Sequence, residues 1–281
     1  MFEVIEKVLL NDYVSKMVIH APMIAKKTAA GQFIIMRVNK YGERIPLTVA
    51  DYNRELGNIT IIYQKVGKTT LLLDSLNVGD NILDVVGPLG KPSELSGYKK
   101  AIVVGGGVGV AIAYPEAKAL TENGCEVEII AGFRSSELII LEEEMKKNSC
   151  KCDIVTDNGS NGNKGLVTDC LEKKLKHNNY DVVIAIGPLP MMKAVCEMTK
   201  KYNVKTIVSM NPIMIDGTGM CGGCRVTVDG EMKFACLDGP EFDGHKVDFD
   251  EIIVRNRTYL KEENVSREKY CNLMKGVSYV K

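Results

Sequence analysis

Short apolar runs separated by turns fill the first part of the chain. The segments 33–38 and 58–63 are rich in β-branched and apolar residues, and Gly and Pro separate such runs from about residue 1 to 95. The segment 68–76 begins with two threonines, carries a Leu-rich face and ends before a turn at 77–80, which predicts a helix. We therefore expect an antiparallel β-barrel over residues 1–97 with one helix in it.

The hydrophobic pattern changes near residue 99. Continuous apolar runs, typical of strands buried on both faces, now alternate with helical segments that include one ending near residue 122 and another at 168–176. This alternation predicts a parallel α/β domain over residues 98–210. The runs are 101–104, 126–130, 152–156, 181–186 and 205–209. The segment 88–92, bounded by two prolines, is expected to be the linker between the two domains.

A third pattern follows residue 211. A small piece rich in Gly and Cys comes first, and a charged helix is expected over about 250–263. The predicted fold class is therefore β plus α/β, with an N-terminal barrel, a parallel-sheet domain and a small C-terminal domain at 211–281. No internal repeat interrupts this order.

Composition excludes several classes of protein. The 281 residues carry 36 Lys and Arg against 36 Asp and Glu, so no basic surface for nucleic acid is indicated. Apolar runs stay shorter than about 18 residues, and we expect neither a membrane span nor a secretory signal. We expect a cytoplasmic protein whose nine cysteines are thiols or metal ligands and form no disulfide framework.

The C-terminal piece contains the most specific motif. Asp216, Cys221, Cys224 and Cys236 are separated by four, two and eleven residues. Apart from the Asp, this spacing matches plant-type [2Fe–2S] sites, in which a Gly-rich loop wraps the cluster, and an Asp oxygen can ligate iron. A zinc site with three Cys and one Asp is the alternative. The other cysteines lack ligand spacing and are interpreted as ordinary thiols: Cys125, Cys150, Cys152, Cys170, Cys196 and Cys271.

A second candidate site combines the segment 44–48 with the predicted helix start at 67–70. An Arg can pair with a pyrophosphate, Pro and Leu can flank an isoalloxazine ring, and helix N-terminal amides attract phosphate oxygens. These features suit FAD, although a strand end with a solvated Arg is the alternative. The candidate residues are Arg44, Pro46, Leu47, Thr48, Gly67 and Thr70.

The third candidate site is a glycine cluster directly after a buried strand. Such a turn lets a dinucleotide approach the backbone at a helix N-terminus, although the spacing is not the usual G-x-G-x-x-G. Arg134 follows the next strand, where an acid that grips the ribose is normally found, and can meet a 2′-phosphate, stack on adenine or remain in solvent. The candidate residues are Gly105, Gly106, Gly107, Gly109, Arg134, Gly187 and Pro188.

The order of these three motifs resembles the ferredoxin-NADP reductase superfamily, and within it the electron-transfer subunits of dihydroorotate dehydrogenase B. The Asp in the first ligand position and the stretch 238–250 are similar to the small subunits of NADH-dependent reduced ferredoxin:NADP oxidoreductases, also known as sulfide dehydrogenase subunit beta or ferredoxin-NADP reductase subunit alpha. The resemblance covers essentially the whole chain. Thr69 replaces a small residue of that family, and Ala185 replaces a frequent Cys, so no catalytic cysteine is expected.

The resemblance implies one FAD between the barrel and the nucleotide domain, with the [2Fe–2S] cluster near it. It also implies hydride exchange with NAD(H) and a larger partner subunit that carries a second FAD and [4Fe–4S] clusters and handles NADP(H) and ferredoxin. Arg134 leaves NADP(H) open as the nucleotide of this chain. Two alternatives remain: a dihydroorotate dehydrogenase B electron-transfer subunit, which usually has four Cys ligands, and a non-enzymatic zinc-stabilised binding protein.

Overall fold

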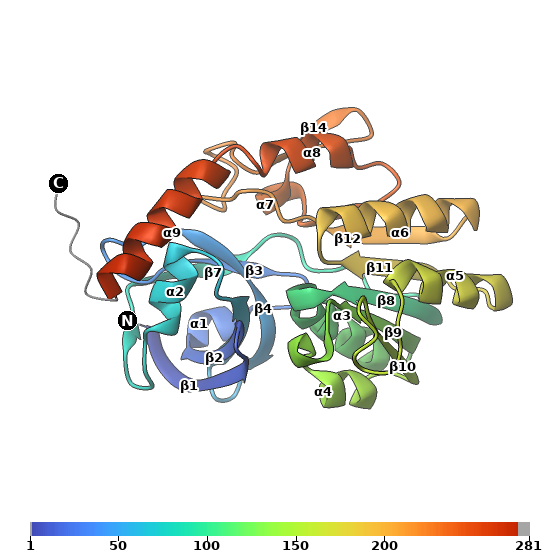
Figure 1. Cartoon of the computed structure of the whole chain (residues 1–281), viewed down its shortest axis with the longest axis horizontal. Helices are drawn as coiled ribbons and strands as arrows, with labels where there is room; N and C mark the ends of the chain where they lie inside the picture. The colour runs from blue at the N-terminus through green and yellow to red at the C-terminus, as the bar shows by residue number, and fades with distance from the viewer. Residues whose placement is uncertain (1, 275–281) are drawn as a thin grey trace.

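The computed structural model describes residues 2–274, and its N-terminal part is a nearly closed antiparallel barrel (Figure 1). Its strand order is β6-β1-β2-β5-β4-β3-β7. Alternating side chains of these strands, including Ile19, Ile34 and Ile61, fill the barrel and are fully buried. The elements are β1 (Phe2–Asn11), β2 (Val14–His20), α1 (Pro22–Ala25), β3 (Phe33–Arg37), β4 (Ile45–Asn53), β5 (Asn58–Gln64), α2 (Lys68–Asp74), β6 (Asn81–Ile82) and β7 (Asp84–Leu89).

The second part is a mainly parallel sheet with the order β10-β9-β8-β11-β12-β15 and helices on both faces (Figure 1). The chain order reverses between β8 and β11, and ligands of open α/β sheets bind at this switch point. The elements are β8 (Lys100–Gly106), η1 (Gly107–Gly109), α3 (Val110–Glu122), β9 (Glu126–Phe133), η2 (Ser136–Leu138), α4 (Glu142–Lys147), β10 (Lys151–Thr156), α5 (Val167–His177), β11 (Val182–Ile186), α6 (Leu189–Lys201) and β12 (Lys205–Ser209).

The C-terminal part packs on both other parts. One apolar cluster joins Phe33 and Ile35 of the barrel to Cys224 and Val226 of this part and to Val104 of the parallel sheet. Its strand β15 pairs antiparallel with β12 and so completes the sheet edge. The elements are β13 (Arg225–Val228), β14 (Glu231–Phe234), α7 (Ala235–Asp238), β15 (Glu241–Asp243), α8 (Phe249–Arg255) and α9 (Leu260–Met274).

The predicted fold class is confirmed, and two local predictions are wrong. The expected linker at 88–92 starts too early, because Pro88 and Leu89 still belong to β7. The single charged helix expected at 250–263 is two helices, α8 and α9. The Thr258 hydroxyl donates to the Arg255 carbonyl at 2.7 Å, and such a side-chain bond competes with the helical ladder. The helix α9, which lies beside α2 in Figure 1, then starts afresh at Leu260.

No helix within residues 2–274 is long and apolar enough to cross a membrane.

Candidate functional site

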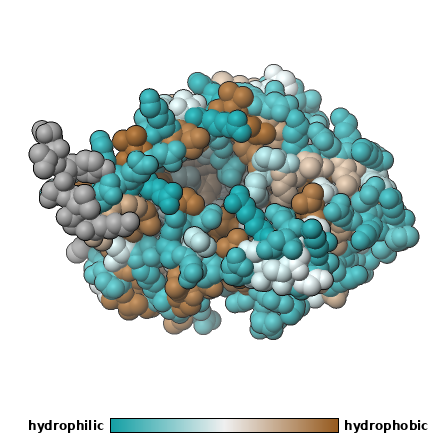
Figure 2. Space-filling view, in the orientation of Figure 1, coloured by the Kyte–Doolittle hydropathy of each residue, from teal (hydrophilic) through white to brown (hydrophobic). Residues whose placement is uncertain are grey.

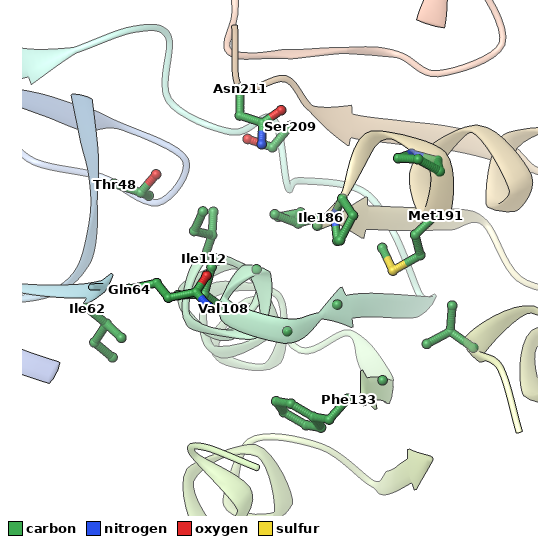
Figure 3. Close-up of a pocket in the computed structure, with 18 of the residues that line it drawn as sticks. Thr48, Ile62, Gln64, Val108, Ile112, Phe133, Ile186, Met191, Ser209 and Asn211 are labelled. Carbon is green, nitrogen blue, oxygen red and sulfur yellow. The ribbon is translucent and has the colours of Figure 1, made fainter. Parts of the chain in front are cut away.

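A cavity of about 920 Å³ lies between the barrel and the parallel sheet. Figure 2 shows a recess on this face of the molecule, and Figure 3 shows the side chains around the cavity. Thr48 and Gln64 reach it from the barrel, while Ile186 and Met191 come from the opposite side. The cavity therefore lies where the carboxyl ends of the parallel strands face the barrel.

Most of the predicted cofactor residues line this one cavity. They are Pro46, Leu47, Thr48, Thr70, Gly106, Gly107, Gly109, Arg134, Gly187 and Pro188. Arg44, Gly67 and Gly105 do not belong to the lining. Strand β4 and the turn after β8 thus form opposite walls of one cavity, although they are far apart in the sequence.

Arg44 holds the barrel to the C-terminal part. Its Nε donates to the carbonyl of Ile215 at 3.0 Å. Within residues 2–274, its two Nη groups make no hydrogen bond or ion pair, so they are available to an anion at this edge of the barrel. The guanidinium therefore joins the barrel next to β4 to the segment that carries Asp216.

Thr70 has a structural role at the start of α2. Its hydroxyl oxygen accepts hydrogen bonds from the amides of Gly67 at 3.0 Å and Val66 at 3.1 Å, and the hydroxyl donates to the Gly67 carbonyl at 3.0 Å. These bonds fix the first turn of α2 against the cavity. The neighbouring Thr69 is buried and donates to Glu43 at 3.1 Å.

Gly105 in β8 and Gly109 in the turn after it are required by close packing. A Cβ on Gly109 would lie 2.5 Å from the Ile186 carbonyl oxygen and 2.7 Å from the Gly187 Cα, both of which are backbone atoms. A Cβ on Gly105 would lie 2.8 Å from the Val110 Cγ2 atom. The turns after β8 and β11 can therefore approach each other this closely only with a glycine at position 109.

Arg134 is exposed and lines the cavity together with Asp157, which sequence reasoning missed. The parallel pairing of β9 with β10 aligns Phe133 with Thr156, so the residues that follow them come to the same sheet edge. The Asp157 amide donates to the Phe133 carbonyl at 3.0 Å. Asp157 is therefore an acid next to Arg134, although it follows β10 and not β9, the second strand of the domain. Its signal in the sequence is an Asp directly after the run 152–156.

Ser209 and Asn211 were also missed. They line the cavity from the end of β12, above Ile186 in Figure 3. Their signal is a pair of polar residues just after a buried parallel strand, where ligand contacts are expected.

The predicted cluster residues come together at the edge of the barrel. The Asp216 carboxylate accepts hydrogen bonds from the amides of Thr218 at 3.1 Å, Met220 at 3.1 Å and Cys221 at 3.0 Å. The Thr218 amide and the other donors of the loop hold the pKa of Asp216 below its usual value, so it is the ionised form that faces the loop. Because a metal binds the ionised carboxylate, this loop favours ligation.

The four side chains form two pairs. The Asp216 Oδ1 and Cys221 Sγ atoms are 3.4 Å apart, and the Cys224 and Cys236 Sγ atoms are 3.2 Å apart. Within the described part of the chain, no three His, Cys, Asp or Glu side chains converge on one point that could hold a single metal ion. Two pairs of donors suit a cluster with two irons.

Backbone amides surround the cysteine sulfurs. The Gly219 amide donates to the Cys236 Sγ at 3.1 Å, and the Gly223 amide to the Cys221 Sγ at 3.4 Å. Burial, followed by the hydrogen bond to Cys224, raises the pKa of Cys236 to about 12, so without a metal this thiol keeps its proton, which metal binding would displace. Amides aimed at sulfur are the usual environment of an iron–sulfur cluster.

The cluster loop lies directly against the barrel. A Cβ on Gly217, whose φ is +78°, would lie 2.6 Å from the Leu89 Cδ1 atom and 2.8 Å from the Ile35 Cγ1 atom. Ile35 belongs to β3, whose neighbour Phe33 lines the cavity. Phe33 and Ile35 point to the same face of β3, while Ile34 and Met36 between and after them fill the barrel. The cavity and the cluster loop therefore lie next to each other on the outer face of this strand.

Comparison with known protein families identifies the parallel-sheet part and the C-terminal part. The family model for the iron-sulfur cluster binding domain of dihydroorotate dehydrogenase B matches residues 211–248, and the model for the oxidoreductase NAD-binding domain matches residues 103–197. Together with the barrel, these domains define an oxidoreductase of the ferredoxin-NADP reductase class that uses FAD, an iron–sulfur cluster and NAD(H). This class and this cofactor set are as predicted from the sequence.

The chain belongs to the family of dihydroorotate dehydrogenase B electron-transfer subunits and their homologues. It is 46% identical over 268 residues to the electron transfer subunit homolog of Thermotoga maritima, covering 95% of both chains. It is 33% identical over 243 residues to the electron transfer subunit of Bacillus caldolyticus, covering 83% of this chain and 92% of the other.

Solved structures extend the comparison. A chain in the structure of NADH-dependent reduced ferredoxin-NADP oxidoreductase, studied for flavin-based electron bifurcation, is 44% identical with a TM-score of 0.92, covering 96% of this chain and 98% of that one. The cytochrome b5 reductase domain of Ulva prolifera nitrate reductase is 19% identical with a TM-score of 0.61, over 73% and 93% of the two chains, and shows the shared fold alone. The predicted resemblance to the NADH-dependent oxidoreductase is confirmed.

Proposed function

We propose that this chain is the small subunit of an NADH-dependent reduced ferredoxin:NADP oxidoreductase. In this role it exchanges hydride between NAD(H) and FAD and passes electrons through a [2Fe–2S] cluster to or from a larger subunit with flavin and [4Fe–4S] clusters, which reaches ferredoxin. The observation that carries the proposal is the placement of the cavity and the cluster loop next to each other on the outer face of β3. The match to the electron-bifurcating oxidoreductase over 96% of the chain supports it.

We assign the flavin to the barrel wall of the cavity. In this assignment Pro46, Leu47 and Thr48 flank the ring, and Thr70 in the first turn of α2 lies near the pyrophosphate. Arg44 lies outside the lining and offers its Nη groups to the pyrophosphate from the edge of the barrel. FAD supplies the conversion between two-electron and one-electron chemistry. The protein's contribution is to hold the ring between the nucleotide turn and the cluster loop, so hydride transfer needs no side-chain acid or base.

We assign the nicotinamide nucleotide to the turns after β8 and β11. The glycines within 105–109 and Gly187 bring their backbone to the switch point of the sheet, where amides can meet the nucleotide, and Pro188, which has no N–H, contributes a wall contact. Asp157 can accept a hydrogen bond from a ribose 2′-hydroxyl and repels a 2′-phosphate, which favours NAD(H). Arg134 then stacks on the adenine or stays in solvent.

The cluster ligands in this proposal are Asp216, Cys221, Cys224 and Cys236, each pair holding one iron. The three functional parts are residues 1–97, 98–210 and 211–281, with β15 of the third part completing the sheet of the second. We further propose that the protein acts in the cytoplasm.

The proposal is tested by anaerobic purification of the chain with its neighbours. We expect flavin absorption with a brown iron–sulfur shoulder, about two irons and two labile sulfides per chain, and bleaching by NADH. A larger flavoprotein with [4Fe–4S] clusters should co-purify. A colourless protein with stoichiometric zinc and no labile sulfide would refute the proposal.

A second candidate is the electron-transfer subunit of dihydroorotate dehydrogenase B, favoured by the 33% identity to such subunits over most of their length. In that case the co-purifying partner carries FMN, and added dihydroorotate reduces the complex. The resemblance described above associates that subfamily with four Cys ligands, and Asp216 therefore favours the first candidate.

A further inference from the structure

Glu116 is a buried carboxyl group that the proposed electron transfer does not use. It lies in the middle of α3 and has no exposed surface. Neither carboxyl oxygen has a hydrogen-bond donor among the described residues. Burying an ionised carboxylate without a partner is very costly in free energy, so such a group is either protonated or shares its charge with a neighbouring group.

The group that faces Glu116 is a second carboxyl, Glu241 at the start of β15. Burial and then the negative charge of Glu241 raise the pKa of Glu116 well above its usual range. Two carboxyl groups in contact cannot both ionise, and a single proton between them forms a strong hydrogen bond. A protonated Glu116 can therefore donate to Glu241 from one of its two unpartnered oxygens.

Among the residues that the structure describes, no cation is paired with either carboxyl group. No ion pair among residues 2–274 includes Glu116 or Glu241, and Lys118, two residues along α3, is paired with Asp51 of the barrel at 3.1 Å. The donor that reaches the pair is the Ser93 hydroxyl, 2.6 Å from the Glu241 Oε1. The ionisable group that acts on Glu116 is thus Glu241 alone.

The pair joins three segments that are far apart in the sequence. Glu116 belongs to α3, Ser93 to the connection after β7, and Glu241 to the C-terminal part. The barrel approaches closely as well, because a Cβ on Gly31 would lie 2.0 Å from the Ser93 hydroxyl oxygen and 3.0 Å from the Glu241 Oε1. All three parts of the molecule therefore meet at this pair.

The pair also stands directly behind the cofactor cavity. Ile112, one helical turn before Glu116, lines the cavity and is seen in its centre in Figure 3. Pro240, the neighbour of Glu241, lines it too. The Pro240 carbonyl accepts from the Met210 amide at 2.9 Å, and Met210 is a further wall residue.

We propose that Glu116 and Glu241 share one proton and act as positioning residues, which hold α3, the connection after β7 and β15 together as one wall of the cofactor cavity. Loss of this proton at alkaline pH places two negative charges in contact and loosens the wall. The proposal goes beyond electron transfer and makes cofactor retention depend on pH.

Thermal unfolding across pH tests the shared proton. A Glu with a raised pKa in the folded state contributes stability at acid pH that is lost as pH rises above the ordinary Glu value of about 4.3 and through the folded value. Glu116→Gln keeps the size and the donor but does not titrate. We expect the Tm of Glu116→Gln minus the Tm of the wild type to increase by at least about 2 °C from pH 5 to pH 9.

The control is Glu122→Gln, an exposed carboxyl on the same helix, whose Tm should follow the wild type at every pH. Parallel Tm curves for Glu116→Gln and the wild type would overturn the proposal. If Glu116→Gln does not fold, as judged by circular dichroism, Glu241→Gln provides the same comparison.

The double variant tests whether the pair acts as a unit. Glu241→Gln removes the repulsion, so it should also flatten the pH dependence, and the double variant should gain little beyond either single one. If Glu241→Gln keeps the wild-type slope, Glu116 titrates alone and the pair is refuted.

Flavin fluorescence of the holoprotein tests the role at the cavity. The wild type should release flavin as pH rises from 7 to 10, while Glu116→Gln retains it. Equal release curves would overturn the positioning role even if the Tm curves differ. An incorrect flavin assignment would leave the wild type without flavin at every pH. Failure of the carboxyl pair would instead appear in the unfolding experiment, which needs no cofactor, so the two failures are distinguishable.

Discussion

Gly109 shows how one atom can decide whether a nucleotide turn forms. In Gly109→Ala the new Cβ meets backbone atoms of β11 and its turn at 2.5–2.7 Å, and backbone cannot rotate away as a side chain can. We expect a loss of about 1–3 kcal/mol in unfolding free energy and a large drop in NADH affinity. Urea unfolding and nucleotide titration would measure both.

Gly107→Ala is the matched comparison. Gly107 has a φ of +55° and open space around its missing Cβ, so the substitution adds conformational strain without overpacking. Its loss of stability should be smaller than that of Gly109→Ala. The opposite order would contradict the packing argument.

Cys224 is buried, with 1% of its surface exposed, and lies 3.2 Å from Cys236. Serine is a poorer ligand for iron than a thiolate, so Cys224→Ser should lose most iron and labile sulfide and the brown absorption, while FAD remains bound. Iron and sulfide assays with a visible spectrum check this result.

The exposed Cys150 is the control, because Cys150→Ser should keep the full iron content. Loss of FAD together with iron in Cys224→Ser would show that the cluster loop and the flavin wall form one unit.

At the scale of elements, α2 is held by an ion cluster at its C-terminus. The Asp74 Oδ1 atom accepts from the Ser15 hydroxyl at 2.6 Å and the Tyr63 hydroxyl at 3.2 Å, and Lys7 and Lys65 lie 3.7 Å from the carboxylate. Although burial opposes ionisation, the bond from Ser15 and the two lysines hold the pKa of Asp74 below its usual value. This cluster positions the helix whose first turn faces the cavity.

Asp74→Asn should therefore lower the unfolding free energy at pH 7 by about 1–3 kcal/mol. Because the folded pKa is lowered, the contribution of Asp74 is complete above its ordinary value of about 3.9 and is lost as pH falls below it. The difference from the wild type should thus shrink towards pH 3. Urea titrations at both pH values measure it, with the exposed Asp12→Asn as control. An equal difference at both pH values would exclude the ionic explanation.

The elements were predictable from local patterns, and their spatial neighbours were not. The runs at 101–104 and 205–209 lie within β8 and β12 because continuous apolar runs need burial on both faces. The two pairs formed by the cluster ligands depend on how the loop folds over Ile35 and Leu89, and spacing does not contain this. Asp157 was missed because its neighbour Arg134 is provided by a different strand. The break at 256–259 depends on one hydroxyl bond.

For the whole molecule, the charges at the cavity mouth set the nucleotide preference. Asp157 and Arg134 line the same cavity, and the acid disfavours a 2′-phosphate while the base attracts it. We expect NADH to reduce the flavin faster than NADPH at low concentration in stopped-flow experiments. Asp157→Asn should reduce the NADH to NADPH ratio by about tenfold, equivalent to about 1.4 kcal/mol.

Arg134→Ala provides the contrast, because it should weaken reduction by NADPH more than by NADH. Faster reduction of the wild type by NADPH would place this chain on the NADP side of the complex and reverse the assignment.

The pairing of β15 with β12 has a consequence for biosynthesis. Until residues 241–243 leave the ribosome, the parallel sheet of the nascent chain ends in an uncovered strand of Thr206, Ile207 and Val208, which are buried in the finished protein. An unpaired apolar edge is a template for intermolecular pairing. The nucleotide-binding part therefore cannot mature before the cluster-binding part has been synthesised, and a chain terminated before residue 241 should accumulate in aggregates rather than as a smaller working enzyme.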